Sequence, residues 1–144
     1  MRGGISIGTQ EKLFKVGEYN KAYNEILEIN LPIVDIMQSQ GFSVHIEKRH
    51  PECIKYIPMI PEIICSPDYI GTNQKEPNSI ELVKILDQNV LLAIKLDTKA
   101  GGLYVASLYE VRDSKISNRL HSGRLKMFSH GKRTFFPLVM GVFL

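Results

Sequence analysis

The second half of the chain contains several runs of apolar and β-branched residues, and they predict a β-sheet. The sequence Thr-Lys-Ala-Gly-Gly at residues 98–102 separates two such runs, which indicates an antiparallel hairpin with a loop rather than a tight two-residue turn. A short polar turn at residues 87–89 joins the preceding run. The pattern therefore predicts an antiparallel meander of three or four strands. The predicted strands are residues 69–71, 80–86, 90–96 and 103–111.

The first half of the chain has a helical period instead. Tyr23, Ile26 and Leu27 recur at helical spacing and predict a helix over residues 19–29. Pro32 ends it, because a proline cannot continue a helix. Short strands are predicted on either side, at residues 12–16 and 33–37, and the first ten residues are expected to be flexible.

Residues 38–50 carry an ambiguous pattern. Phe42, Val44 and Ile46 alternate with polar residues as in a strand, but Phe42 and Ile46 also begin an i, i+4 stripe for which Ser39 is available as N-cap. We favour a helix, because no run rich in valine, isoleucine or threonine follows Ile46. His50 precedes a proline, which makes it a natural helix boundary.

Two short helical turns follow, at residues 52–57 and 62–65, each after a proline that fits the first position of a helix. A final helix, capped by Asp113 or Ser114, is expected to run through Ile116 and Leu120. The predicted fold is α+β, with N-terminal helices packed on a three- to four-stranded antiparallel sheet and a closing C-terminal helix. We expect one domain over residues 1–126 and a tail over residues 127–144.

Composition agrees with a globular domain. The chain has 144 residues, of which 44% are hydrophobic, and this content is enough for a core. Its net charge of +3 implies little about partners. Cys53 and Cys65 have no metal-binding spacing and read as reduced core thiols of a cytosolic protein. No signal peptide is visible, and the apolar stretch at residues 135–144 is too short to cross a bilayer, so no membrane is expected.

The first candidate site is the segment His45-Ile-Glu-Lys-Arg-His50. On a helix, His45 shares a face with Lys48 and Arg49. The two cations would lower the pKa of the His45 imidazole and favour its neutral form, which could act as a base beside a bound anion. The alternative is a solvated helix face with an incidental histidine.

The second candidate site is the segment Arg119-Leu-His-Ser-Gly-Arg124. Arg119 and Arg124 can each donate paired hydrogen bonds to phosphate oxygens, and Ser122 and Gly123 add a hydroxyl and an unhindered N–H. The alternative is a basic last turn of a helix followed by a C-cap glycine. The two segments would form one phosphate-binding pocket only if the fold brings them together.

Other site types find little support. The four histidines and the scattered carboxylates lack metal-ligand spacing, and no nucleotide-binding loop or dinucleotide fingerprint is present, so neither metal nor cofactor is expected. Tyr69, Tyr104 and Tyr109 lie on predicted strands. They are suited to stacking on bases, although strand aromatics more often pack in a core.

Six blocks, taken in order, resemble a known family. They are His45-Ile-Glu-Lys-Arg-His-Pro-Glu52, Ile60-Pro-Glu-Ile-Ile, Pro67-Asp-Tyr-Ile-Gly71, Ile80-Glu-Leu-Val, Leu103-Tyr-Val-Ala-Ser and Arg119-Leu-His-Ser-Gly-Arg-Leu-Lys126. Through these blocks, residues 40–126 resemble the phage-associated branch of the barnase, EndoU, colicin and RelE-like (BECR-fold) nucleases. The resemblance implies a small α+β fold and a toxin-like, metal-independent ribonuclease of phage, prophage or mobile-element origin that acts in the bacterial cytoplasm.

We therefore predict an endoribonuclease that cleaves RNA, with tRNA as one candidate substrate, by attack of a ribose 2′-OH. His45 is the candidate base and His50 or His121 the candidate acid, with a cognate immunity or antitoxin protein or a phage component as a further partner. The alternatives are a nucleic-acid-binding module without catalysis and a structural or interaction component of a phage. The predicted catalytic residues are His45, Arg49, His50, Arg119, Ser122 and Arg124. The predicted substrate-binding residues are Lys48, Tyr69, Lys95, Tyr104, Lys115, His121 and Lys126.

Overall fold

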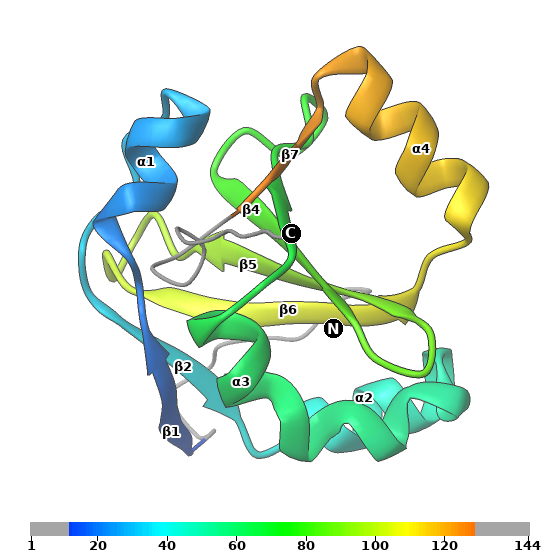
Figure 1. The fold of residues 1–144 in the computed structure, drawn as a ribbon. Helices are drawn as coiled ribbons and strands as arrows, with labels where there is room; N and C mark the ends of the chain where they lie inside the picture. The colour runs from blue at the N-terminus through cyan, green and yellow to red at the C-terminus, as the bar shows by residue number, and fades with distance from the viewer. Residues whose placement is uncertain (1–11, 129–144) are drawn as a thin grey trace.

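The computed structural model describes residues 12–128, which form a seven-stranded mixed sheet with helices on both faces (Figure 1). Across the sheet the strands follow the order β1-β2-β6-β5-β4-β3-β7. The elements are β1 (Leu13–Glu18), α1 (Lys21–Leu27), β2 (Asp35–Ser39), α2 (Phe42–Arg49), the 3-10 helix η1 (Pro51–Met59), α3 (Ile60–Cys65), β3 (Tyr69–Gly71), β4 (Ser79–Ile85), β5 (Asn89–Leu96), β6 (Leu103–Glu110), α4 (Asp113–Ser122) and β7 (Leu125–Met127).

The predicted meander is present in β3, β4, β5 and β6, where each strand pairs antiparallel with the next. The loop between β5 and β6 closes through bonds from Asp97 N to Gly102 O at 2.8 Å and from Gly101 N to Asp97 O. Gly101 has a φ of +83°, a conformation that few residues other than glycine adopt. Local runs of apolar residues and the turn residues between them therefore suffice to predict this part.

The predicted size of the sheet is wrong, because three further strands join the meander. Two of them, β1 and β2, confirm the short strands predicted near residues 12–16 and 33–37, and the third, β7, was not predicted. β1 pairs with β2, and β2 lies parallel to β6 through Ile36 opposite Leu103 and Met37 opposite Tyr104. β7 pairs with β3 at the other edge. The predicted order of helices before sheet is also wrong, since β1 and β2 alternate with α1 and α2. No local pattern reveals the pairing of β2 with β6, because the partners are far apart in sequence.

The two faces of the sheet carry different helices. On one face α1, α2, η1 and α3 cover the main core, which contains Tyr23, Phe42 and Ile46. On the other face α4 packs through Ile116 and Leu120 over only part of the sheet (Figure 1). The strand residues of this second, smaller core are Tyr69, Val83, Leu91, Ala93, Tyr109 and Leu125.

Several helix boundaries differ from prediction. The helix chosen for residues 38–50 is confirmed as α2, but its N-cap is Gly41, because Ser39 is buried as the last residue of β2. The N-cap of α4 is Arg112 rather than Asp113 or Ser114, so Asp113 stands in the first turn, where its charge favours the helix dipole. The two predicted helical turns are part of a continuous helical segment, in which α3 follows η1 without a break.

Both cysteines are free, but only Cys53 is buried, and Cys65 is exposed rather than in the core. Met127, where the predicted tail begins, ends β7 opposite Tyr69. The rest of that tail and the predicted flexible first ten residues lie outside the described residues. No helix within residues 12–128 has the length and apolar character needed to span a membrane.

Candidate active site

Three rows of side chains cross the sheet face on which α4 lies, because residues directly opposite one another on neighbouring strands share a face. In one row Tyr69, Val83, Leu91 and Tyr109 form the core beneath α4. The middle row runs Leu125, Gly71, Glu81, Ala93, Ser107. The last row runs Ser79, Lys95, Tyr104, Met37. Glu81 therefore stands at the border between the half of this face that α4 covers and the half that no helix within residues 12–128 covers, which is called the open half below.

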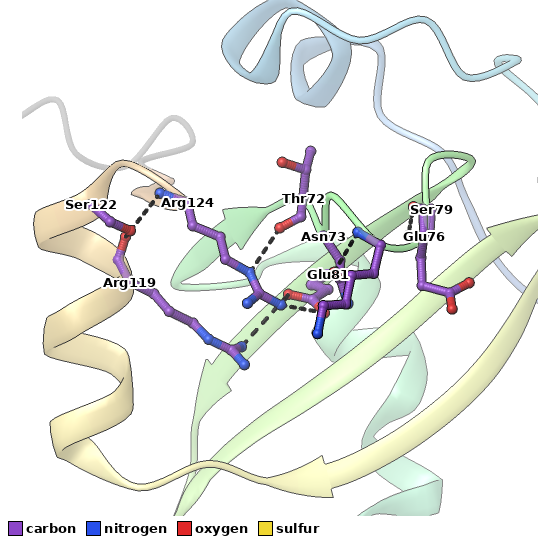
Figure 2. A network of polar contacts seen from close by, with 9 residues as sticks. Thr72, Asn73, Glu76, Ser79, Glu81, Arg119, Ser122 and Arg124 are labelled. Atoms are coloured by element: carbon purple, nitrogen blue, oxygen red, sulfur yellow. Dashed lines mark hydrogen bonds and ion pairs between the residues drawn. The ribbon is translucent and has the colours of Figure 1, made fainter.

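Glu81 is a buried carboxylate between two guanidinium groups, and Figure 2 shows both pointing toward it. Arg124 Nη2 contacts Glu81 Oε1 at 3.1 Å and Oε2 at 3.2 Å, and Arg124 Nε donates to the carbonyl oxygen of Thr72 at 3.0 Å. Arg119 Nη1 lies 3.6 Å from Glu81 Oε1. A buried carboxylate needs such partners, since removing it from water is otherwise very unfavourable.

Local structure brings both arginines to this point. Arg119 follows Ile116 by three residues on α4, so both face the sheet when Ile116 enters the core. Gly123 then caps the helix in the left-handed region, with φ +86°, and turns the chain so that Arg124 comes back over β4. Gly71 permits the close approach, because a Cβ there would collide with the Arg124 carbonyl oxygen.

Tyr109 links the two predicted segments. Its ring centroid lies 5.6 Å from that of His50, which stands at the junction of α2 and η1. Burial raises the pKa of the Tyr109 hydroxyl, and the charge of Glu81 acts in the same direction, while Arg119 and Arg124 oppose it. The first segment therefore reaches Tyr109 through His50, and the second reaches it through Arg119.

His45 lies on α2, five residues before His50, and is partly exposed. Its pKa is lowered, as expected from the sequence, but burial is the largest cause, followed by the charges of Arg49 and His50. Lys48 is exposed on the same helix. A lowered pKa keeps the imidazole neutral near pH 7, the form that accepts a proton.

A polar pocket of about 440 Å³ adjoins the arginines, between the β3–β4 loop and the turn from α4 to β7. Ser122 Oγ donates to Arg119 O at 3.1 Å and accepts from Arg124 N at 3.3 Å. The hydroxyl that was predicted to be catalytic therefore makes hydrogen bonds that stabilise the turn between α4 and β7. The pocket is lined by Thr72, Asn73, Gln74, Lys75, Ser122, Gly123 and Arg124.

The predicted substrate-binding residues are spread over several surfaces. Lys95 and Tyr104 stand opposite each other on the open half of the face that carries Glu81. Tyr69 packs in the core beneath α4. Lys126 is opposite Ile70, whose side chain belongs to the main core, so it lies on the other face. Three others are exposed on α2 or α4: Lys48, Lys115 and His121.

Sequence reasoning missed Glu81 and did not place Tyr109 in a site. A signal for Glu81 was present, because it is the single charge in the run Ile80-Glu-Leu-Val83. A charge inside a buried strand requires a counter-charge from elsewhere in the chain. Within residues 12–128 no three histidine, cysteine, aspartate or glutamate side chains are grouped as metal ligands.

Comparison with known proteins shows that one protein family matches this sequence. A family model described as phage-Barnase-EndoU-ColicinE5/D-RelE like nuclease3 matches residues 14–118. The match extends the resemblance seen from residue 40 onward back to β1, and it includes His50, Glu81 and Tyr109 but ends just before Arg119. No curated protein and no solved structure gives a significant match.

Proposed function

The chain belongs to this nuclease family, and on that premise we propose that it is an endoribonuclease that cleaves RNA without a metal ion, by attack of a ribose 2′-OH on the adjacent phosphorus. The observation that carries the proposal is the cluster of Arg119 and Arg124 around Glu81, at the border of an open sheet face and joined to His50 through Tyr109. Nuclease chemistry requires positive charge around a phosphodiester together with groups that transfer protons.

The two arginines suit the charge that develops during cleavage. With one carboxylate between two guanidinium groups, the cluster keeps one net positive charge. Arg119 Nη1 is buried, lies 3.6 Å from Glu81 Oε1 and makes no hydrogen bond to a described residue, and in this scheme it turns toward a phosphate oxygen when RNA binds. A donor placed in this way toward a pentacoordinate phosphorane typically contributes about 10²–10³ in rate.

Two histidines suit the proton transfers. His45, whose pKa is lowered, accepts the proton of the 2′-OH while its oxygen attacks phosphorus. The bond from phosphorus to the 5′-oxygen then breaks, and His50 donates a proton to that leaving oxygen. The products are a 2′,3′-cyclic phosphate and a free 5′-OH. Contact with Tyr109 favours His50 over His121 for this role, because Tyr109 also lies beside Arg119.

Glu81 acts in this scheme as a positioning residue. Its two oxygens orient the guanidinium of Arg124, and they hold Arg119 close by at 3.6 Å. The side chain of Glu81 is 4% exposed, so its role is to fix the arginines rather than to meet the substrate.

The test is cleavage of a defined RNA by the purified protein in EDTA. We expect a 2′,3′-cyclic phosphate end, and we expect His45→Ala, His50→Ala and Arg119→Ala each to lower the rate by at least about 10²-fold. Arg112→Ala is the matched control, since this arginine is exposed at the N-cap of α4. Full activity in all three site variants would remove the assignment of roles, and an absence of cleavage of any RNA would contradict the activity.

One observation favours a second function, a nucleic-acid-binding module without catalysis. Glu81 already occupies Arg124 and so reduces the charge that is free for phosphate. In that case binding would fall steeply with salt, Arg119→Ala would weaken it, and His45→Ala would change it little. The cleavage assay separates the two functions.

A further inference from the structure

The open row of side chains beside Glu81 carries a second pair of groups suited to RNA. We propose that Lys95 and Tyr104 form a subsite for the nucleotide next to the one cleaved, and that Glu76 competes with the RNA for Lys95. The inference rests on the proposed function insofar as it takes RNA as the substrate. Its evidence is separate, however, because none of these three residues belongs to the arginine cluster.

Sheet register places this pair at a defined distance from the site. Lys95 and Tyr104 lie directly opposite each other. Lys95 is two residues along β5 from Ala93 in the row that contains Glu81, and Tyr104 is three residues along β6 from Ser107 in that row, because the register shifts between the two rows. Two residues along a strand span about 6.8 Å and neighbouring strands lie about 4.8 Å apart, so Lys95, one strand from Glu81, is about 8 Å from it, and Tyr104, two strands away, is about 12 Å from it. A strand of RNA with a phosphate at the arginines would therefore have its next nucleotide over this pair.

The two side chains have complementary chemistry for a single-stranded nucleotide. Both are partly exposed, and the pair stands on the half of the sheet face that lies outside the core beneath α4. A tyrosine ring can stack on any base, and a lysine beside it can contact the phosphate. A stacked base must be unpaired, so this subsite selects single-stranded RNA.

Glu76 is held where it pairs with Lys95. The Glu76 carboxylate contacts Lys95 Nζ at 2.9 Å. Its backbone N–H donates to Asn73 O at 2.9 Å, and its carbonyl oxygen accepts from Ser79 Oγ at 2.6 Å. Glu76 lies in the β3–β4 loop, and Figure 2 shows its carboxylate directed away from Glu81.

The ion pair is exposed enough for RNA to displace it. The side chains of Lys95 and Glu76 are 37% and 49% exposed, and ion pairs in such positions are weak. The carboxylate therefore lowers affinity for phosphate without abolishing it. Removing it should strengthen RNA binding, an effect opposite to that of most changes in a binding site.

The experiment measures binding of a single-stranded 2′-O-methyl oligonucleotide, which lacks the attacking hydroxyl, by fluorescence anisotropy. Tyr104→Ala should weaken binding by about 5- to 150-fold, the range of one stacked base, and Tyr104→Phe should keep the wild-type affinity. Lys95→Ala should weaken binding and lower the slope of log K against log salt by about 0.7. Glu76→Gln should strengthen binding by up to about fivefold, and this gain should vanish in the Lys95→Ala background.

Glu18→Gln is the matched control. Glu18 pairs with Lys15 at 2.8 Å on β1, so this change also removes one negative charge beside a lysine, although Lys15 keeps a second partner, Asp35, at 3.4 Å. Equal effects of Glu76→Gln and Glu18→Gln, wild-type affinity in Tyr104→Ala, or an absence of binding by the wild type would each overturn the subsite. Because this ligand cannot be cleaved, a protein that binds as expected but cuts no RNA would keep the subsite and lose the proposed ribonuclease.

Discussion

Removing the Glu81 carboxylate should strongly destabilise the fold. Glu81→Ala leaves the guanidinium groups of Arg119 and Arg124 beside each other without an anion. The side chain of Arg119 is 14% exposed, so it cannot recover its hydration without moving α4. Arg124 is 34% exposed and keeps its bond to Thr72. The uncompensated charge of Arg119 is therefore the main unfavourable term.

The size of the effect follows from this difference in exposure. Removing one partner of a buried ion pair destabilises a protein by about 3–5 kcal/mol. Because Arg124 can turn partly toward solvent, we expect a loss near the lower end, about 3 kcal/mol. Domains are typically stable by about 5–15 kcal/mol, so the variant should still fold at 25 °C.

Urea denaturation followed by circular dichroism measures this loss. The midpoint should fall while the slope stays unchanged, since the surface exposed on unfolding is nearly the same. Glu62→Ala is the control, because Glu62 also pairs with a basic side chain, Lys84 at 3.8 Å, but is 54% exposed. Its loss should be below about 1 kcal/mol.

A second variant tests the cause. If the uncompensated charge of Arg119 causes the loss, the double variant Glu81→Ala/Arg119→Ala should lose less unfolding free energy than the sum of the losses of the two single variants. The reason is that the double variant no longer buries an unpaired cation. A Glu81→Ala protein within about 1 kcal/mol of wild type would refute the reasoning. It would mean that water or movement of α4 solvates the arginines at little cost.

Three further predictions concern other parts of the fold. Gly71→Ala should destabilise by about 1–3 kcal/mol in urea, because its Cβ would meet the carbonyl oxygen of Arg124, whereas Gly102→Ala, with open space around it, should have little effect. Tyr23→Phe should cost about 1–3 kcal/mol by the same measurement, because its hydroxyl donates to a buried carbonyl at 2.7 Å. By NMR, His45 should titrate below its usual pKa of 6.5. The unfolded state then binds the proton at higher pH, so the unfolding free energy should fall as pH drops below about 6.5, and a pH-independent free energy there would contradict this.

The central sheet was predictable because its information is local. Each pairing from β3 to β6 joins neighbours in the chain, and apolar runs separated by turn residues indicate it. The parallel pairing of β2 with β6 rests on two residue pairs far apart in sequence. β7 is as short as β3, but its partner is β3 itself, far earlier in the chain, so no neighbouring run marks it as a strand. Such contacts form because the tertiary structure provides a partner, not because the segment has a strong preference of its own.

The candidate site divides in the same way. Arg119, Arg124 and His50 could be proposed from residue type, since guanidinium and imidazole groups suit phosphate chemistry wherever they meet. What the sequence could not supply was their common partner. Glu81 lies in an apolar strand, and its need for a counter-charge became informative only once α4 was placed over the sheet.

This division explains why the site depends on the last part of the described chain. The matched family region ends at residue 118, and it contains Glu81, Tyr109 and His50. Without the arginines that follow, this region would bury an unpaired carboxylate, which is unfavourable. The end of α4 and the segment that leads into β7 therefore complete the fold, and they also supply the positive charges of Arg119 and Arg124. A change that detaches β7 from β3 should thus lower both stability and nuclease activity, because Arg124 leaves Glu81 when β7 leaves the sheet.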